Sequence, residues 1–281
     1  MKFRHNTDIG QNFLRDLSVA DWMVSRANLT PDDFVLEIGP GSGVLTKAIM
    51  ASGCGGLDAI EIDTRLKTDL EPLASDPRLA LHWEDAVRFD YTALDVVPTR
   101  IMANLPYHIT TPVIWRLLEA YSGSRMTYMM LMTQAEAAKR LASGAGSRDS
   151  NPLSITIAAS GGAVVVRKVP RSAFYPAPRV DSAIVEIKLR RQSETSAGTA
   201  NDKMWRRLLS GSFATRRKTL VNNWAGSFHI TRGESLEILS SHSLGEMSRP
   251  EELSVGEWLA ISGDSALKQA ILGGEIENET C

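Results

Sequence analysis

Apolar and polar positions along the first two thirds of the chain predict strands and helices in turn. Apolar runs of strand length occupy residues 34–38, 57–62, 79–83, 101–103, 126–132 and 183–189. Between them, the pattern predicts helices at 18–28, 44–50, 111–121 and 134–142, whereas 153–160 fits either a helix or a strand. This order predicts an α/β fold with a doubly wound sheet.

The last third of the chain has a different pattern. Residues 190–202 have the composition of a linker, and helical patterns follow at 203–213, 215–224, 232–240 and 254–262. The acidic end, 275–281, is expected to fray. We therefore predict two domains, an α/β domain over 1–190 and a small all-helical domain over 203–281.

Four positions with ligand-binding character follow or end successive predicted strands. They are the glycine turn with Gly39 and Gly41, then Glu61, Asp85 and Asn104. Because parallel strands bind ligands at their carboxyl ends, we expect these residues to line one site. Glycines let a nucleotide approach the backbone, and an acid about 20 residues further on suits ribose hydroxyls. The G-x-G-x-G spacing is not the G-x-G-x-x-G of NAD-binding turns.

The stretch Asn104-Leu105-Pro106-Tyr107 predicts a site for a flat nitrogenous base. The Asn104 side-chain carbonyl can accept a hydrogen bond from an exocyclic amine. Pro106 biases Leu105 towards extended geometry, which can aim a backbone carbonyl at the same amine. Tyr107 offers a π-face for stacking. The alternative is a simple strand-ending turn, since Asn and Pro are common in turns.

Composition narrows the class of protein. No apolar run approaches the roughly 18 residues of a membrane span, and the N-terminus lacks the apolar core of a signal peptide. Cys54 and Cys281 form no disulfide or ligand pattern, which suits the cytoplasm. No metal site is predicted, because the histidines are scattered at 5, 82, 108, 229 and 242.

The net charge of −2 conceals an uneven distribution. Residues 160–232 hold 14 Lys and Arg against 4 Asp and Glu, a local net charge of +10, so the remainder carries −12. This asymmetry indicates either a basic face for a polyanion or a solvated charged surface.

Seven stretches of the chain resemble, in order and spacing, the KsgA family of small-subunit ribosomal RNA adenine dimethyltransferases. The similarity covers about residues 4–262. The seven stretches are Gln11-Asn12-Phe13-Leu14, Glu37-Ile38-Gly39-Pro40-Gly41, Glu61-Ile62-Asp63, Asp85-Ala86, Asn104-Leu105-Pro106-Tyr107, the loop Phe174 to Ser182, and Arg216-Arg217-Lys218-Thr219.

The resemblance implies a Rossmann-like methyltransferase fold with a small C-terminal helical domain, and S-adenosylmethionine as the cofactor. It implies methyl transfer to the exocyclic amines of two adjacent adenosines near the 3′ end of 16S rRNA, in small-subunit biogenesis. The implied partner is small-subunit ribosomal RNA or the pre-30S particle. A cytoplasmic monomer without a metal or a membrane is expected.

The resemblance also implies residue roles. Glu61 is expected at the cofactor's ribose and Asp85 at its adenine amine; the expected cofactor contacts are Asn12, Leu14, Gly39, Gly41, Glu61, Asp85 and Asn104. The expected catalytic residues are Asn104, Leu105, Tyr107 and Phe174. Of these, Tyr107 and Phe174 would sandwich a flipped adenine. A core aromatic is the alternative for Phe174. RNA binding falls to Arg216, Arg217 and Lys218, on a helix.

Two positions depart from the family pattern, both where relatives carry basic residues: Ala135, within Gln134-Ala135-Glu136, and Asp8. Three alternatives stay open at this point. They are a large-subunit rRNA adenine methyltransferase of the erythromycin-resistance type, a non-catalytic ribosome-assembly factor of the same fold, and an unrelated dinucleotide oxidoreductase.

Overall fold

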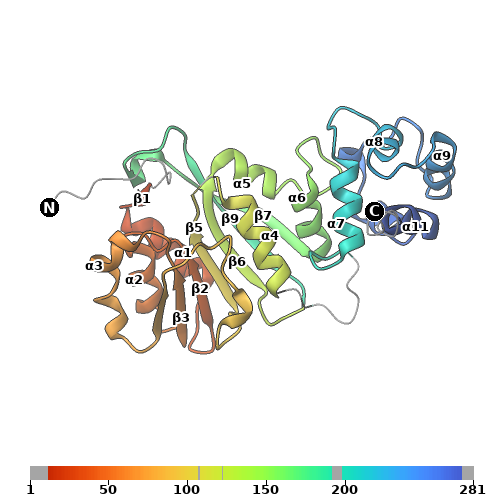
Figure 1. Ribbon diagram of the computed structural model, residues 1–281. Helices are drawn as coiled ribbons and strands as arrows, with labels where there is room; N and C mark the ends of the chain where they lie inside the picture. The colour runs from red at the N-terminus through yellow and green to blue at the C-terminus, as the bar shows by residue number, and fades with distance from the viewer. Residues whose placement is uncertain (1–11, 107, 122, 192–197, 274–281) are drawn as a thin grey trace. The chain divides into compact units, whose positions relative to one another are not determined.

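The computed structural model describes residues 12–106, 108–121, 123–191 and 198–273 (Figure 1). These residues form two compact units. The first runs to Ala142 and resumes over Ala163–Arg191; the second comprises Ser143–Gly162 and the described residues from 198 onward. The segment 143–162 therefore groups with the second unit, whereas the sequence pattern placed it within the first domain.

The first unit is built on a seven-stranded sheet with the order β4-β3-β2-β5-β6-β9-β7. The five strands β4, β3, β2, β5 and β6 pair in parallel, and β9 is antiparallel to β6. The strands are β2 (Phe34–Ile38), β3 (Gly56–Ile60), β4 (Leu79–His82), β5 (Arg100–Asn104), β6 (Tyr128–Gln134), β7 (Gly161–Val169) and β9 (Ser182–Leu189). Central strands are buried on both faces, which explains their continuous apolar sequences.

The helices of the first unit follow the strands in the order that a doubly wound sheet requires. They are α1 (Leu17–Ala27), α2 (Val44–Ala51), the short α3 (Lys67–Leu70), α4 (Thr110–Tyr121) and α5 (Ala135–Leu141). Helix α1 begins at a cap from Asp16, whose carboxylate accepts the Ser18 N–H. It ends at Asn28, which adopts the left-handed conformation typical of a helix C-cap.

A two-stranded sheet lies beside the main one. Strand β1 (Phe13–Leu14) pairs antiparallel with β8 (Phe174–Tyr175), so that Leu14 lies opposite Phe174. The predicted Pro-rich loop thus begins with a short strand, and this strand binds the N-terminal stretch to a segment about 160 residues away. Leu14 and Phe174 are both buried in the core of the first unit.

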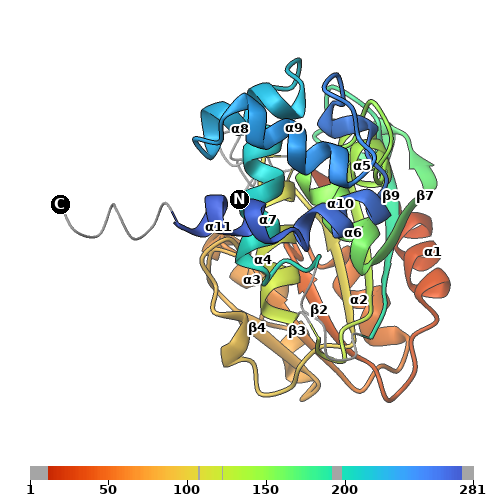
Figure 2. The same ribbon diagram turned by 90° about the vertical axis from the view of Figure 1, so that its right-hand side faces the viewer.

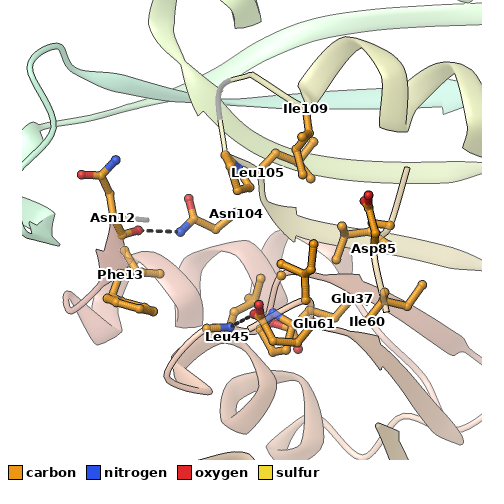
Figure 3. A pocket seen from close by; sticks show the side chains of 18 of the residues that line it. Asn12, Phe13, Glu37, Leu45, Ile60, Glu61, Asp85, Asn104, Leu105 and Ile109 are labelled. Carbon is orange, nitrogen blue, oxygen red and sulfur yellow. Dashed lines mark hydrogen bonds between the residues drawn. The ribbon is translucent and has the colours of Figure 1, made fainter. Parts of the chain in front are cut away.

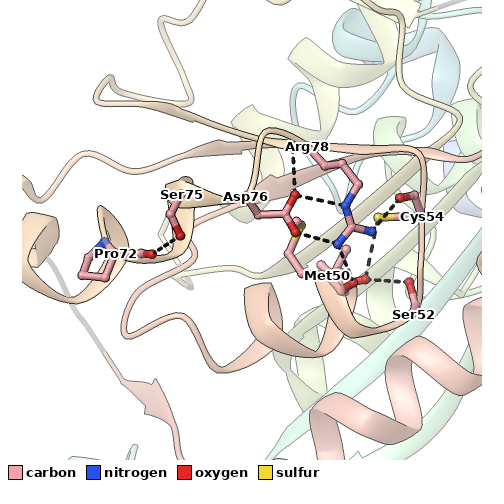
Figure 4. Close-up of polar contacts among 8 residues, drawn as sticks. Met50, Ser52, Cys54, Pro72, Ser75, Asp76 and Arg78 are labelled. Carbon is pink, nitrogen blue, oxygen red and sulfur yellow. Dashed lines mark hydrogen bonds and ion pairs between the residues drawn. The ribbon is translucent and has the colours of Figure 1, made fainter.

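A clamp of polar contacts joins the loops at the amino ends of β3 and β4 (Figure 4). The guanidinium of Arg78 pairs with the Asp76 carboxylate at 2.7 Å and donates to the carbonyl oxygen of Cys54 at 3.2 Å. It also reaches the carbonyl oxygen of Met50 at the end of α2. These contacts satisfy backbone carbonyls that the ends of α2 and β3 leave open.

The second unit is all-helical apart from its share of β7, and Figure 2 shows its helices from the side. It contains α6 (Pro152–Ser160), α7 (Lys203–Ser212), α8 (Leu220–Ser227), α9 (Arg232–Ser241), α10 (Val255–Ser262) and α11 (Ser265–Gly273). Its core is built around three fully buried tryptophans, Trp205, Trp224 and Trp258.

Three sequence predictions for this unit need revision. The ambiguous segment 153–160 is a helix, which starts at a capping box formed by Asn151 and Ser154. The helix predicted over 215–224 starts only at Leu220, so the three basic residues 216–218 lie in a turn and not on a helix. Helix α11 was missed, although Gly263 and Asp264 separate it from α10 and the Asp264 carboxylate accepts the Leu267 N–H.

Candidate active site

A pocket of about 350 Å³ lies at the carboxyl ends of β2, β3, β4 and β5 (Figure 3). Nine of the predicted site residues line it: Asn12, Leu14, Gly39, Gly41, Glu61, Asp85, Asn104, Leu105 and Phe174. Tyr107 falls outside the described residues. The predicted RNA-binding residues, 216–218, belong to the second unit and do not line this pocket. The structure therefore brings the predicted cofactor residues together from distant parts of the chain.

The glycine turn lines the pocket, and its backbone adopts the left-handed region that favours glycine. Gly39 and Gly41 have φ angles of +70° and +57°. A Cβ on Gly41 would lie 3.0 Å from the Phe13 ring, so a side chain there would be both strained and crowded. At these two positions the pocket wall is therefore backbone without side chains.

Glu61 holds this turn as well as facing the pocket. One carboxylate oxygen accepts the Gly41 N–H at 3.1 Å, and the other accepts the Asp63 N–H at 2.9 Å. Burial raises the pKa of Glu61, and the two backbone hydrogen bonds counteract part of that rise. The sequence interpretation gave Glu61 only a ligand-binding role; the structure adds a structural one.

Asp85 lies in the loop that follows β4, and hydrogen bonds hold this loop in place. Its carboxylate accepts the Val87 N–H at 2.9 Å and stays partly exposed to the pocket. The next residue, Ala86, accepts a 2.6 Å hydrogen bond from the buried hydroxyl of Tyr91. The Tyr91 carbonyl in turn accepts from the Tyr121 hydroxyl of α4. These contacts give the Asp85 carboxylate a defined position before any ligand binds.

The Asn104 amide is oriented by the N-terminal stretch. Its Nδ2 donates to the backbone carbonyl of Asn12 at 3.3 Å, which leaves Oδ1 as the acceptor (Figure 3). The Pro106 carbonyl is already occupied, since it accepts from the Ile109 N–H and the Thr110 hydroxyl. By contrast, the Leu105 carbonyl accepts no hydrogen bond from any described residue, while its N–H donates to Met132 of β6.

Glu37 is a pocket residue to which the sequence interpretation gave no role. It lies on β2, is 1% exposed, and within the described chain neither carboxylate oxygen has a hydrogen-bond partner of standard geometry. Burial raises its pKa to about 8; the nearby Thr46 hydroxyl offsets part of this rise, and the Glu61 charge adds to it. A charged residue inside the apolar run 34–38 was the signal that could have identified it.

Phe174 belongs both to the core of the first unit and to the lining of the pocket. It is 5% exposed and packs in the core of the first unit, yet it also lines the pocket. The core alternative therefore describes its packing, and its stacking on a target base stays a prediction.

The described residues contain neither a candidate metal site nor a candidate membrane span. No cluster of three or more His, Cys, Asp or Glu side chains there could hold a metal ion. Within the same ranges, every helix is too short or too polar to cross a bilayer.

The strand order, with β9 antiparallel beside β6 and a pocket at the carboxyl ends of the parallel strands, defines a Rossmann-like methyltransferase domain. Residues 2–265 match the family model described as ribosomal RNA adenine dimethylase. The chain belongs to this family.

Curated relatives agree with this assignment. The chain is 37% identical over 254 residues to a ribosomal RNA small subunit methyltransferase A from Rubrobacter xylanophilus, covering 90% of this chain and 92% of the relative. It is 35% identical to the protein of the same name from Lactobacillus delbrueckii subsp. bulgaricus, over 91% of this chain and 88% of that one.

Solved structures share the fold. A dimethyladenosine transferase from Plasmodium falciparum superimposes with a TM-score of 0.75 at 24% identity, covering 89% of this chain and 95% of that one. The 23S rRNA methyltransferase ErmE superimposes with a TM-score of 0.64 at 25% identity, over 89% and 98% of the two chains.

Proposed function

We propose that this protein transfers methyl groups from S-adenosylmethionine to the exocyclic amines of two adjacent adenosines near the 3′ end of 16S rRNA. The observation that carries the proposal is the oriented Asn104 amide, which shares one pocket with Glu61, Asp85 and the glycine turn. The names of the curated relatives support the small-subunit substrate.

The pocket residues fit S-adenosylmethionine. Glu61 retains acceptor capacity for the ribose hydroxyls, and Asp85 offers a carboxylate to the adenine amine. The bare turn at Gly39 and Gly41 leaves room for the amino-acid part of the cofactor. Glu37, a buried acid without a partner among the described residues, suits a cationic ligand that would supply the missing charge or donor. When bound, the cofactor supplies a methyl group on a positively charged sulfur.

The protein's part in the chemistry is to prepare the adenine amine. Its lone pair is delocalised into the ring, which makes it a poor nucleophile. Asn104 Oδ1 and the Leu105 carbonyl would accept hydrogen bonds from the two amine protons and draw the nitrogen towards tetrahedral geometry. Positive charge develops on this nitrogen during transfer, so fixed carbonyl dipoles stabilise the transition state more than the ground state. Phe174, with Tyr107, would hold the flipped base.

The second unit is the proposed RNA-binding part. Arg216, Arg217 and Lys218 are all exposed, and each phosphate they neutralise would release condensed counterions. This proposal keeps the division of labour between two domains, with the segment 143–162 now assigned to the RNA-binding one.

Transfer of a labelled methyl group tests the function. The protein is incubated with S-adenosylmethionine and with isolated small or large ribosomal subunits that lack the modification. We expect label in small-subunit RNA alone, and none with heat-denatured protein. The structural likeness to ErmE makes large-subunit RNA the second candidate, so label confined to the large subunit would replace the proposed substrate. Small subunits that bind the protein but gain no label would favour an assembly factor.

A further inference from the structure

A buried asparagine, Asn223 of α8, organises the turn that carries the predicted RNA-binding cations. Its Nδ2 lies 2.7 Å from the carbonyl oxygen of Ser212, 3.2 Å from that of Thr215 and 3.4 Å from that of Lys218. Its Oδ1 accepts the Thr215 N–H at 3.0 Å. The side chain is 3% exposed. One neutral amide therefore ties the start, middle and end of the turn 213–219 together.

The base on which this turn rests is closely packed. The Trp224 indole donates to the Ser212 hydroxyl at 2.8 Å, and both residues are fully buried. On Gly211, the residue before Ser212, a Cβ would clash with the Phe228 ring, so α7 approaches the end of α8 more closely than a side chain permits. Both helices that flank the turn are thus held against each other.

The three cations of the turn are not equivalent. The Arg216 guanidinium donates to the backbone carbonyl of Arg148 at 2.7 Å, which attaches the turn to the loop before α6. The side chains of Arg217 and Lys218 are exposed and form no hydrogen bond or ion pair with any residue that the structure describes. The turn thus exposes two cations, while hydrogen bonds from Asn223 and within the backbone hold Thr215 and Lys218.

We propose that Asn223 is a positioning residue for RNA binding, which holds the turn 213–219 so that Arg217 and Lys218 meet neighbouring phosphates without prior ordering of the backbone. Such preorganisation removes an entropic cost from association. Asn223 itself touches no RNA, because it is buried. The inference rests on the proposed function, since it takes small-subunit RNA as the polyanion.

Asn223 is uncharged, so replacing it leaves the number of cations in the turn unchanged, and this allows a decisive test. Equilibrium binding of the full-length protein to unmethylated small subunits is measured over a series of salt concentrations. Arg217→Ala and Lys218→Ala should each reduce the slope of log K against log salt by about 0.7–0.9. Asn223→Ala should reduce it by about 1.4–1.8, as the double variant does, although every cation is still present. The KM for small subunits should rise while kcat at saturating subunits stays unchanged.

Asn222→Ala is the matched control, because Asn222 is the exposed neighbour on the same helix. Its salt slope should equal that of the wild type. A folded Asn223→Ala protein with the wild-type slope would overturn the inference, and so would an equal loss of slope in Asn222→Ala. If instead the proposed function is wrong, the wild type itself shows no methyl transfer to small subunits, which separates the two failures.

A second measurement decides the matter even if Asn223→Ala does not fold. Amide hydrogen exchange is followed in the wild-type protein without RNA. The Thr215 amide, which donates to Asn223, should be protected, and it should stay protected in Arg217→Ala/Lys218→Ala. Exchange of this amide at the rate of an unstructured peptide would show that the turn is not preformed and would overturn the inference.

Discussion

The pocket of the first unit and the basic turn 213–219 of the second unit differ in how their polar groups are hydrogen-bonded. The pocket gathers residues from the ends of four separate strands and leaves buried acceptors open, above all the carboxylate of Glu37. The turn uses consecutive residues, and Asn223 binds the backbone of Ser212, Thr215 and Lys218, so the exposed side chains of Arg217 and Lys218 take no part in holding it. We therefore expect the ligand to bind the open acceptors of the pocket, whereas the turn is held by the protein's own hydrogen bonds before RNA binds.

The largest effect is expected at the pocket's reactive end. Asn104→Ala should slow methyl transfer by about 100- to 1,000-fold, by analogy with the loss of one oriented oxyanion-hole donor. The reason is that Oδ1 acts where charge develops. Single-turnover methylation at saturating cofactor measures the change, and calorimetry checks that cofactor affinity stays within a few-fold of wild type. Near-native turnover in a folded variant would move the reactive group elsewhere.

Substitution of Glu61 tests whether its carboxylate binds the cofactor. Glu61→Ala should weaken cofactor binding by about 10- to 100-fold, because ribose loses a charged acceptor and the Gly41 turn loses its support. Glu61→Gln retains one acceptor oxygen and should fall between Ala and wild type. Both affinities come from calorimetry on protein whose circular dichroism is unchanged. An Ala variant that binds the cofactor like wild type would remove Glu61 from the site.

Burial of Glu37 makes the stability of the first unit depend on pH. Its pKa rises from 4.5 to about 8 in the fold, so the folded state keeps a proton that the unfolded state releases. The resulting stabilisation is complete below pH 4.5 and is lost as the pH rises through 8. Relative to Glu37→Gln, the cofactor-free wild type should lose on the order of a few kcal/mol of unfolding free energy between pH 5 and pH 9.

Thermal melts of the two proteins at both pH values measure this difference. Glu61 also has a raised pKa, but it is present in both proteins and cancels in the comparison. Parallel pH profiles for wild type and Glu37→Gln would mean that Glu37 is ionised in the folded protein.

The smallest effect is expected within the basic turn. Arg216→Ala should reduce the salt slope of RNA binding by less than Arg217→Ala, because the Arg216 guanidinium is engaged by the Arg148 carbonyl. Filter binding at several salt concentrations is sensitive enough, since a full phosphate contact changes the slope by about 0.7–0.9. An Arg216 effect equal to or above that of Arg217 would show that the two cations are equivalent.

The two regions also differ in what their sequences reveal. Apolar runs of strand length predicted six of the seven strands of the main sheet. The four polar or glycine positions at the ends of these runs could be placed at one edge, because the carboxyl ends of parallel strands meet there; they are Gly39, Glu61, Asp85 and Asn104. The pairing of Phe13 with Tyr175 could not be predicted, since two-residue strands have no periodicity.

In the basic turn the motif was visible but its conformation was not. Helix propensity favoured a helix through 216–218, yet the buried amide of Asn223 offers the backbone a competing set of hydrogen bonds. Glu37 was overlooked for a related reason, because only the packed structure shows that its carboxylate has no partner among the described residues.

Nucleotide-resolution mapping tests the central claim most directly. Unmethylated small subunits are incubated with the protein and S-adenosylmethionine, and the modified positions are located by mass spectrometry of RNA fragments, with Asn104→Ala as the control. The account predicts dimethylation of two adjacent adenosines near the 3′ end of 16S rRNA, absent from the control. Methylation at any other site, or an equal yield from Asn104→Ala, would contradict it.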